Sequence, residues 1–187
     1  MKKLFALVSI LIVVLASCRP KGGIDANTGY FSITALRDSL TKGKPVLKFK
    51  KTLFVEGKSE TQTITDSLHL QIAFFDHFEI NKPAYRGAYT VDTITSKPDG
   101  TGICHDTKYT KNEKFKFPVT YFSHSKCENG HTYITAKSIE SNLLTTIAKT
   151  LRIDADNNRF LSYNYEINET LNGGAPSSTI IMLKLAE

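Results

Sequence analysis

Apolar and polar residues alternate through most of the second half of the chain, which is the pattern of antiparallel strands that bury one face. The alternation predicts strands that contain residues 85–91, 115–121, 133–140, 143–153, 160–168 and 179–185. Turn signals lie among them at Lys97-Pro98-Asp99-Gly100, Glu128-Asn129-Gly130, Asp154 to Asn158 and Asn172-Gly173-Gly174. We therefore expect about seven antiparallel strands after Pro83.

The preceding segment predicts one hairpin and two helices. Residues 46–55 alternate as a half-buried strand, and residues 59–65 return as a polar strand at a sheet edge. Residues 66–80 place apolar side chains at helical spacing and end before a proline, which predicts a longer helix. A shorter helix is expected over residues 30–40.

Together these elements predict an α+β fold in a single domain, residues 30–187. The longer helix (66–80) and the sheet each have one apolar side. The simplest way to bury both is to pack that helix on one face of the sheet. We expect that sheet to be mainly antiparallel and either curved or shaped as a half-open barrel. The order of elements loosely resembles that of carriers of the lipoprotein-localisation type. This is a likeness of layout, and a fold does not fix a function.

The first residues have the pattern of an export signal. Residues 4–15 are apolar except for one serine, and a helix of that length covers only about 18 Å of a hydrocarbon layer about 30 Å thick. The next residues, Leu15-Ala16-Ser17-Cys18, resemble the lipobox of bacterial lipoproteins, in which the cysteine is acylated and becomes the new N-terminus. We expect a signal peptide over 1–17 and a lipidated tether over 18–29. The alternative is an ordinary signal peptide that contains a cysteine.

This interpretation predicts a protein of the cell envelope, anchored to a membrane through acyl chains on Cys18. By analogy with other lipoproteins, the absence of aspartate after Cys18 favours the outer membrane, and periplasmic and surface-facing positions both stay open. The whole chain has 24 Lys and Arg against 18 Asp and Glu, a net charge of +6. Loss of Lys2 and Lys3 with the leader lowers this to +4, so we expect no nucleic-acid partner.

Two cysteines remain in the exported domain, and an exported chain with an even number of cysteines favours a disulfide between Cys104 and Cys127. The alternative is a zinc site, because His105, His124 and His131 lie close to these cysteines in sequence. That spacing matches no standard zinc motif, and a disulfide would consume both thiolates. We therefore expect the disulfide, no metal and no cofactor.

Two further candidate sites, a possible calcium loop and a pair of histidines, are better explained as ordinary structural features. The segment Asp154-x-Asp156-x-Asn158 begins like a calcium loop but has Arg159 and Tyr165 where that loop needs glycine and glutamate, so it reads as a turn. His69 and His77 lie about 80° apart around a helix and do not converge.

The lysines form a basic cluster, for which a solvated strand face is the default and contact with an anionic membrane the alternative. Its members are Lys42, Lys44, Lys48, Lys50, Lys108, Lys111, Lys114 and Lys116.

No common catalytic motif occurs in the sequence, so we expect no enzyme activity. The expected function is a binding or structural module of the envelope, with a hydrophobic ligand, a glycan or a partner protein as its target. A small hydrolase with a dispersed active site is the alternative, because scattered triads leave no local trace. A purely structural or immunity-type partner is the third hypothesis.

Several short segments resemble a set of uncharacterised Bacteroidota lipoproteins. The likeness is carried by the Lys-rich hairpin at 50–60, the helix that ends in Ile80-Asn81-Lys82-Pro83-Ala84, the later Asn142-Leu143-Leu144 and the strand around Tyr163 and Tyr165. This chain departs from that set because it has no tryptophan in the helix. The resemblance implies a lipid-anchored envelope protein and transfers no activity and no site residue.

Overall fold

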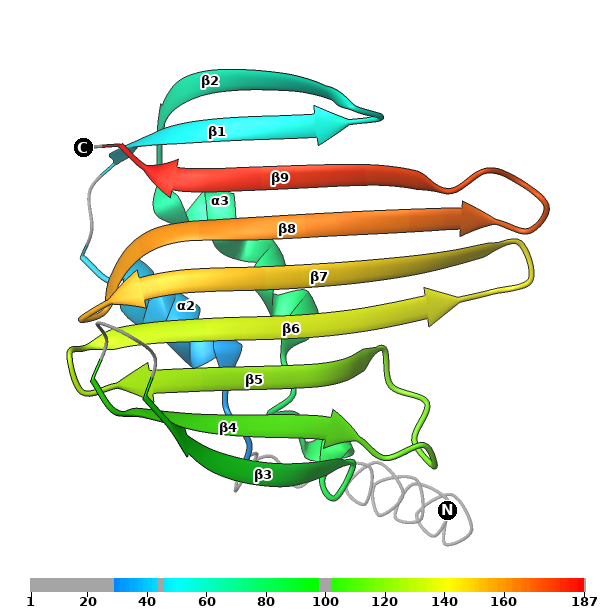
Figure 1. The fold of residues 1–187 in the computed structure, drawn as a ribbon, viewed down its shortest axis with the longest axis horizontal. Helices are drawn as coiled ribbons and strands as arrows, with labels where there is room; N and C mark the ends of the chain where they lie inside the picture. The colour runs from blue at the N-terminus through cyan, green and yellow to red at the C-terminus, as the bar shows by residue number, and fades with distance from the viewer. Residues whose placement is uncertain (1–28, 44–45, 98–101, 187) are drawn as a thin grey trace, which may run out of the picture.

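The computed structural model describes residues 29–43, 46–97 and 102–186, and these form one antiparallel sheet with short helices on one side. The sheet has nine strands in the order β2-β1-β9-β8-β7-β6-β5-β4-β3 (Figure 1). The strands are β1 (Leu47–Val55), β2 (Lys58–Asp66), β3 (Tyr89–Ser96), β4 (Cys104–Lys111), β5 (Val119–Cys127), β6 (His131–Ser141), β7 (Thr145–Asp156), β8 (Arg159–Leu171) and β9 (Ser177–Leu185). The predicted antiparallel sheet is therefore confirmed, and seven of its strands, β3 to β9, follow Pro83.

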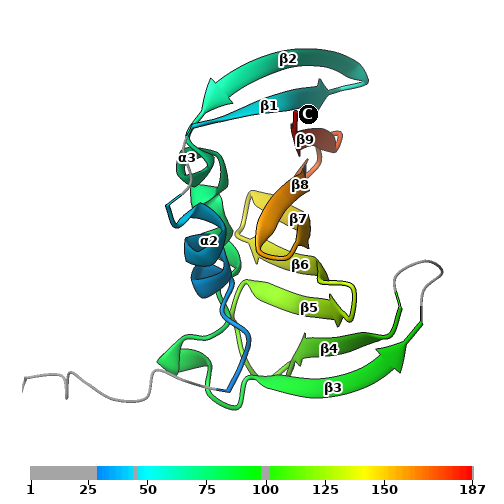
Figure 2. The same cartoon turned by 90° about the vertical axis from the view of Figure 1, so that its left-hand side faces the viewer.

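The helices lie against one face, which we call the covered face. They are α2 (Ile33–Thr41), α3 (Leu68–Ile72) and the 3₁₀ helix η1 (Ala73–Phe78), and a short 3₁₀ turn, η2 (Pro83–Tyr85), leads into β3. No described helix lies on the opposite, open face (Figures 1 and 2). The sheet is strongly twisted, and Figure 2 shows its outer strands projecting past the central ones on the open side.

The expectation of one helix over residues 66–80 is only partly right. Asp66 is the last residue of β2, and the rest of the segment is a five-residue α-helix followed by a 3₁₀ helix. Leu68 and Ile72, four residues apart, share a buried side of α3. Phe75 and Phe78 are three residues apart, and a 3₁₀ helix brings this spacing onto one side because it has three residues per turn.

The strand expected over 115–121 begins later than its alternation suggests. β5 starts at Val119, directly after Pro118, whose ring cannot donate to a strand ladder. Phe115 and Phe117 lie in the preceding connection, where their rings stack with centroids 5.8 Å apart. Phe117 also contacts Tyr85, at a centroid distance of 4.0 Å.

The core fills the space between the covered face and the helices. Tyr163, Ile153 and Ile134 are register partners on β8, β7 and β6, and each is at most 4% exposed. Phe75 packs edge-on against Tyr163, with ring centroids 5.9 Å apart. Burial raises the pKa of Tyr163 to about 12, so its phenol stays neutral at physiological pH. Each fully buried apolar side chain of this kind contributes about 1.5–3 kcal/mol before entropy.

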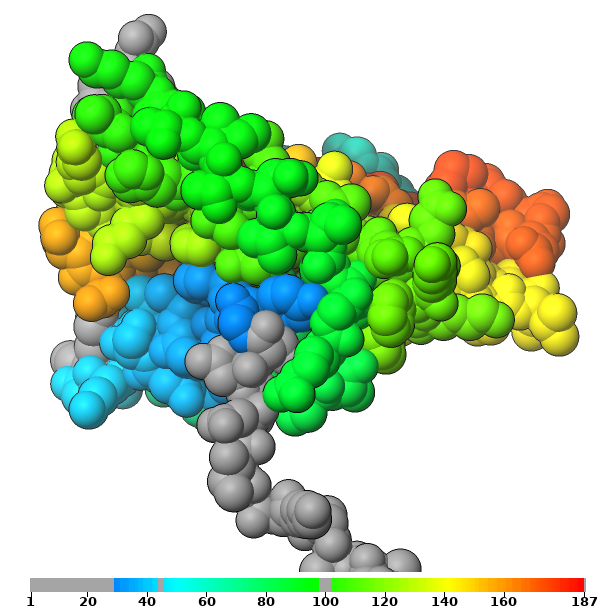
Figure 3. All heavy atoms as spheres, turned by 90° about the horizontal axis from the view of Figure 1, so that it is seen from below, coloured from blue at the N-terminus to red at the C-terminus, as the bar shows by residue number. Residues whose placement is uncertain are grey.

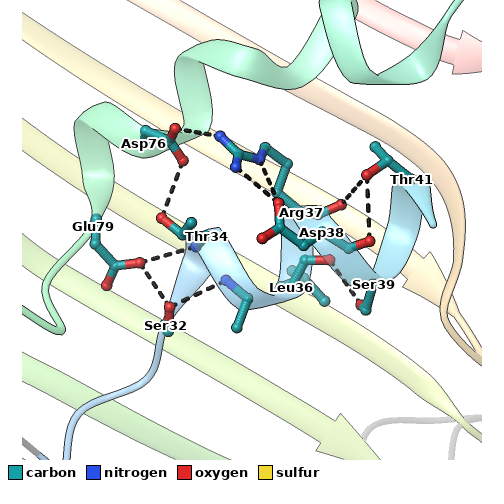
Figure 4. A network of polar contacts seen from close by, with 10 residues as sticks. Ser32, Thr34, Leu36, Arg37, Asp38, Ser39, Thr41, Asp76 and Glu79 are labelled. Carbon is teal, nitrogen blue, oxygen red and sulfur yellow. Dashed lines mark hydrogen bonds and ion pairs between the residues drawn. The ribbon is translucent and has the colours of Figure 1, made fainter. Parts of the chain in front are cut away.

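A polar clamp joins α2 to η1 (Figure 4). Glu79 is only 7% exposed, and its Oε2 accepts hydrogen bonds from Ser32 Oγ at 2.8 Å and from the backbone N–H of Thr34 at 2.9 Å. Its Oε1 accepts from the backbone N–H of Asn81 at 2.6 Å. One turn further on, Arg37 forms ion pairs with Asp38 and Asp76. These contacts fix the angle at which α2 crosses the sheet.

The predicted disulfide is present. Cys104 and Cys127 are direct register partners on β4 and β5, with Cα atoms 3.9 Å apart, and both are buried. The bond therefore joins two neighbouring strands near their ends. The leader, Cys18 and the expected tether lie outside the described residues, apart from Gly29. Within the described part of the chain, no helix has the length and apolar character needed to cross a membrane.

Two hairpin tips project from the same end of the molecule (Figures 1 and 3). The β6–β7 tip carries Leu143 and Leu144, which are 91% and 74% exposed. Asn172, in the β8–β9 tip, ties the two together: its backbone N–H donates to the Leu144 carbonyl at 2.9 Å, and its side-chain amide donates to the Leu143 carbonyl. The leucines are thus held in place at the tip without being part of the core.

Candidate functional site

The open face of the sheet is hollowed into a groove of about 560 Å³, which crosses the central strands. The groove lies over five consecutive strands of the sheet, β1, β9, β8, β7 and β6. Since neighbouring strands are 4.7–4.9 Å apart, five strands give it a length of about 19 Å. That length fits an extended ligand better than a compact one.

Two rows of register partners line the groove. The first row runs Lys50, Lys184, Ser162, Asp154, Tyr133, and the second runs Thr52, Met182, Asn164, Arg152, Thr135. All ten belong to the alternate positions that point away from the core, because residues such as Leu183 and Ile153 between them are buried on the covered face. The strand ladder alone therefore assembles the site.

The lining combines apolar surface with hydrogen-bonding groups. Tyr133 is 38% exposed and Met182 is 42% exposed, so each offers an apolar surface to a ligand. Threonine and serine hydroxyls and the Asn164 amide supply donors and acceptors between them. A shallow groove with one aromatic side chain and several polar groups is suited to binding a polar ligand.

A histidine and a carboxylate meet at the β6–β7 end of the groove. His131 Nδ1 and Asp154 Oδ1 are 3.7 Å apart, which is too long for a hydrogen bond, and the contact is an ion pair only when the imidazole is protonated. Both atoms are buried, and neither has a hydrogen-bond partner among the described residues. The imidazole also stacks on Tyr133, with ring centroids 5.8 Å apart and planes 11° from parallel.

The arrangement of Ser162, Asp154 and His131 differs from that of a catalytic triad. In a triad the histidine stands between the nucleophile and the carboxylate. Here Asp154 lies on the middle strand, with Ser162 opposite it on β8 and His131 near it on β6. The carboxylate therefore separates the hydroxyl from the imidazole, and the three residues do not make an activated nucleophile.

The structure separates the residues considered for zinc. Cys104 and Cys127 are consumed by the disulfide. His124 points to the covered face, where its ring stacks on Phe31 at 4.5 Å, whereas His131 points to the open face. Burial lowers the pKa of His124, and the charge of Lys126 adds to this while that of Asp106 opposes it. Within the described residues, no three His, Cys, Asp or Glu side chains are grouped as metal ligands.

The remaining sequence candidates fall in different places. Asp154 and Asp156 belong to β7, and the turn that follows uses Asn157 and Asn158 in the left-handed conformation, at φ 46° and 61°. His69 and His77 are exposed. Of the basic cluster, Lys50 enters the groove, which was not apparent from the sequence because its neighbours come from distant strands.

Comparison of the chain with protein-family models, with curated proteins and with solved structures finds no match.

Proposed function

We propose that this chain is a lipid-anchored lipoprotein of the cell envelope, on the outer membrane, that acts as a binding module. Its ligand site is the groove on the open face. The lipobox-like segment that ends in Cys18 supports the anchor. The groove supports binding, because it presents exposed apolar and polar side chains from five strands on a rigid sheet.

Among the expected ligands, a glycan fits this groove better than a hydrophobic molecule. The apolar side chains of the covered face are already packed in one core with α2, α3 and η1. The groove instead has hydroxyl and amide groups beside Tyr133, and sugars are bound by such hydrogen bonds together with an aromatic surface.

Catalysis by a small hydrolase is the alternative, and the site gives it less support. A hydroxyl and a carboxylate line the groove and an imidazole lies beside them, but their order across β8, β7 and β6 does not let the imidazole act on the hydroxyl. We therefore propose binding without a chemical step.

The binding proposal is tested with the intact protein purified from membranes in mild detergent and applied to an array of oligosaccharides. We expect retention of a subset of glycans. Tyr133→Ala should weaken that retention by about tenfold, as expected for an aromatic residue at the centre of a contact. Tyr121→Ala is the matched control, because Tyr121 follows the same alternation on the open face but does not line the groove. Equal loss in both variants, or no retained glycan, would contradict the proposal.

The anchor is tested separately by intact mass. We expect the native product to begin at Cys18 with acyl chains attached, and Cys18→Ser to abolish the acylation. A product with an unmodified Cys18 thiol, or one that retains residues 1–17, would show that the N-terminal interpretation is wrong.

A further inference from the structure

The groove contains three cationic side chains that have no anionic partner in the part of the chain that the structure describes. Lys50, Lys184 and Arg152 line it, against the single carboxylate of Asp154. Among the described residues, none of the three cations has a carboxylate oxygen within 4.0 Å, and none donates a hydrogen bond to another described side chain. By contrast, Lys149 on β7 pairs with Glu140 at 2.8 Å.

Two of these cations are placed where they repel each other. Lys50 and Lys184 are direct register partners on β1 and β9, and like charges directly opposite each other destabilise an antiparallel pair. Arg152 lies two strands away from Lys184, in the second row, beside Asn164. The arrangement is unfavourable for the free protein and becomes favourable when an anion lies between the cations.

The rest of the groove also requires hydrogen-bond donors from its ligand. The Asp154 side chain is 37% exposed, although its Oδ1 atom is buried. The exposure therefore falls on the rest of the side chain. An ionised carboxylate only accepts hydrogen bonds, so a ligand at this end must donate them. Sugar hydroxyls are donors and can be placed at this end, next to the exposed ring of Tyr133.

We propose that the ligand of the groove is an acidic glycan, a chain of sugars that carries carboxylate or sulfate groups. The inference rests on the proposed binding function and names its ligand class. The anionic groups lie between Lys50, Lys184 and Arg152, along the part of the groove that runs from β1 to β7. Neutral hydroxyls face Asp154, and one sugar ring lies on Tyr133.

Titration calorimetry measures the affinity of the intact protein for three oligosaccharide probes. The probes are a tetrasaccharide of galacturonic acid, its fully methyl-esterified form and a chondroitin sulfate tetrasaccharide. The ester has the same length and ring geometry without the charge, and the sulfated probe separates sulfate from carboxylate recognition. We expect at least one acidic probe to bind at least tenfold more tightly than the ester, with an affinity that falls as salt is raised.

Single substitutions test which cationic side chains contact the acidic probe. Lys184→Gln and Arg152→Gln should each weaken binding of the acidic probe at least fivefold and weaken binding of the ester much less, so that the preference for the acid over the ester falls. Lys137→Gln is the matched control, because it removes the same charge from an exposed position on the open face outside the groove, and it should change the affinity less than twofold.

Any one of three results would overturn the inference. If the ester binds as tightly as the acid, or if Lys137→Gln has the same effect as Lys184→Gln, the groove does not select an anion. In that case a Tyr133-dependent affinity for neutral glycans would leave the proposed binding function intact. If no acidic probe binds, the inference fails whatever else the protein retains, and if no glycan of any kind binds, the proposed function fails with it.

Discussion

Glu79 and Ser32 lie 47 positions apart in the sequence, and Ser32 Oγ donates a hydrogen bond of 2.8 Å to Glu79 Oε2. The same oxygen accepts from the backbone N–H of Thr34, and the other carboxylate oxygen accepts from that of Asn81. Both oxygens of this buried carboxylate are therefore acceptors of backbone donors. The contact holds the beginning of α2 against the end of η1 (Figure 4).

We expect Glu79→Gln to destabilise the fold, although glutamine has the same shape. Its amide must place an NH₂ group against one of the two backbone N–H donors, which leaves that donor without a partner. The expected cost is about 1.5–3 kcal/mol, the value for a lost hydrogen bond to a charged group. Urea unfolding measures it. Glu60→Gln, on an exposed position of β2, should change the free energy of unfolding by less than about 0.5 kcal/mol.

The disulfide predicts a response to reductant. Cys104 and Cys127 are 23 positions apart, and closing a loop of that length stabilises the fold by about 3 kcal/mol in the chain-entropy model. We expect dithiothreitol to lower the urea midpoint of the native protein. The Cys104→Ala/Cys127→Ala variant should be destabilised already and should not respond to the reductant. If reductant leaves the urea midpoint of the native protein unchanged, the disulfide between Cys104 and Cys127 is contradicted.

His124 predicts that stability falls on mild acidification. Burial lowers its pKa in the folded protein, so the unfolded chain binds a proton more readily than the folded one. The contribution of neutral His124 is therefore fully present above its unfolded pKa, about 6.5, and is lost as the pH falls below that value. The free energy of unfolding, measured from pH 7.5 to 5, should therefore fall as the pH is lowered. His124→Phe should flatten this decrease, whereas His69→Asn, at an exposed position, should leave it unchanged.

Replacing the leucines of the hairpin tip should change the free energy of unfolding much less than replacing a leucine of the core. Leu143 and Leu144 are almost fully exposed, so Leu143→Ser/Leu144→Ser should change the free energy of unfolding by about 0.5 kcal/mol or less. Leu151, on β7 of the same sheet, is fully buried, and Leu151→Ala should cost about 2–5 kcal/mol. A large loss in the tip variant would show that the tip packs against something in the folded protein.

Sequence reasoning succeeded where the signal is local. The alternation around Phe49 predicts β1, although only Phe49 of its apolar face is buried and Leu53 and Val55 are exposed, and Asn129-Gly130 marks the turn between β5 and β6. The disulfide between Cys104 and Cys127 was predicted from an even cysteine count in a domain that the sequence predicts to be exported. In each case the residues that carry the signal also form the structure.

The expected helix over residues 66–80 is only partly right, because packing decides its form. The helical spacing of Leu68, Ile72 and Phe75 predicts one continuous helix, but the aromatic residues of the sheet favour a 3₁₀ turn that brings Phe75 and Phe78 to the same side. Ring contacts such as that between Phe78 and Tyr165, at 6.1 Å, join residues that no short sequence window contains. Tertiary contacts therefore override the local periodicity.

The groove could not be predicted from the sequence. Its lining residues come from five strands, and Lys50 and Lys184 become neighbours only because β1 pairs with β9. Each residue on its own is an ordinary outward-facing position of a strand. A one-residue shift of any strand would turn its outward side chains into the core, so the site depends on the register of the whole sheet.

The pairing of β1 with β9 has a consequence for how the protein is made. The hairpin of β1 and β2 docks onto β9 (Ser177–Leu185), which comes much later in the sequence, so the sheet cannot be completed until that strand has been made. Contacts between the two ends of a chain are slow to form because a long loop must close first. Truncation before residue 177 should therefore leave β1 and β8 with exposed, aggregation-prone edges.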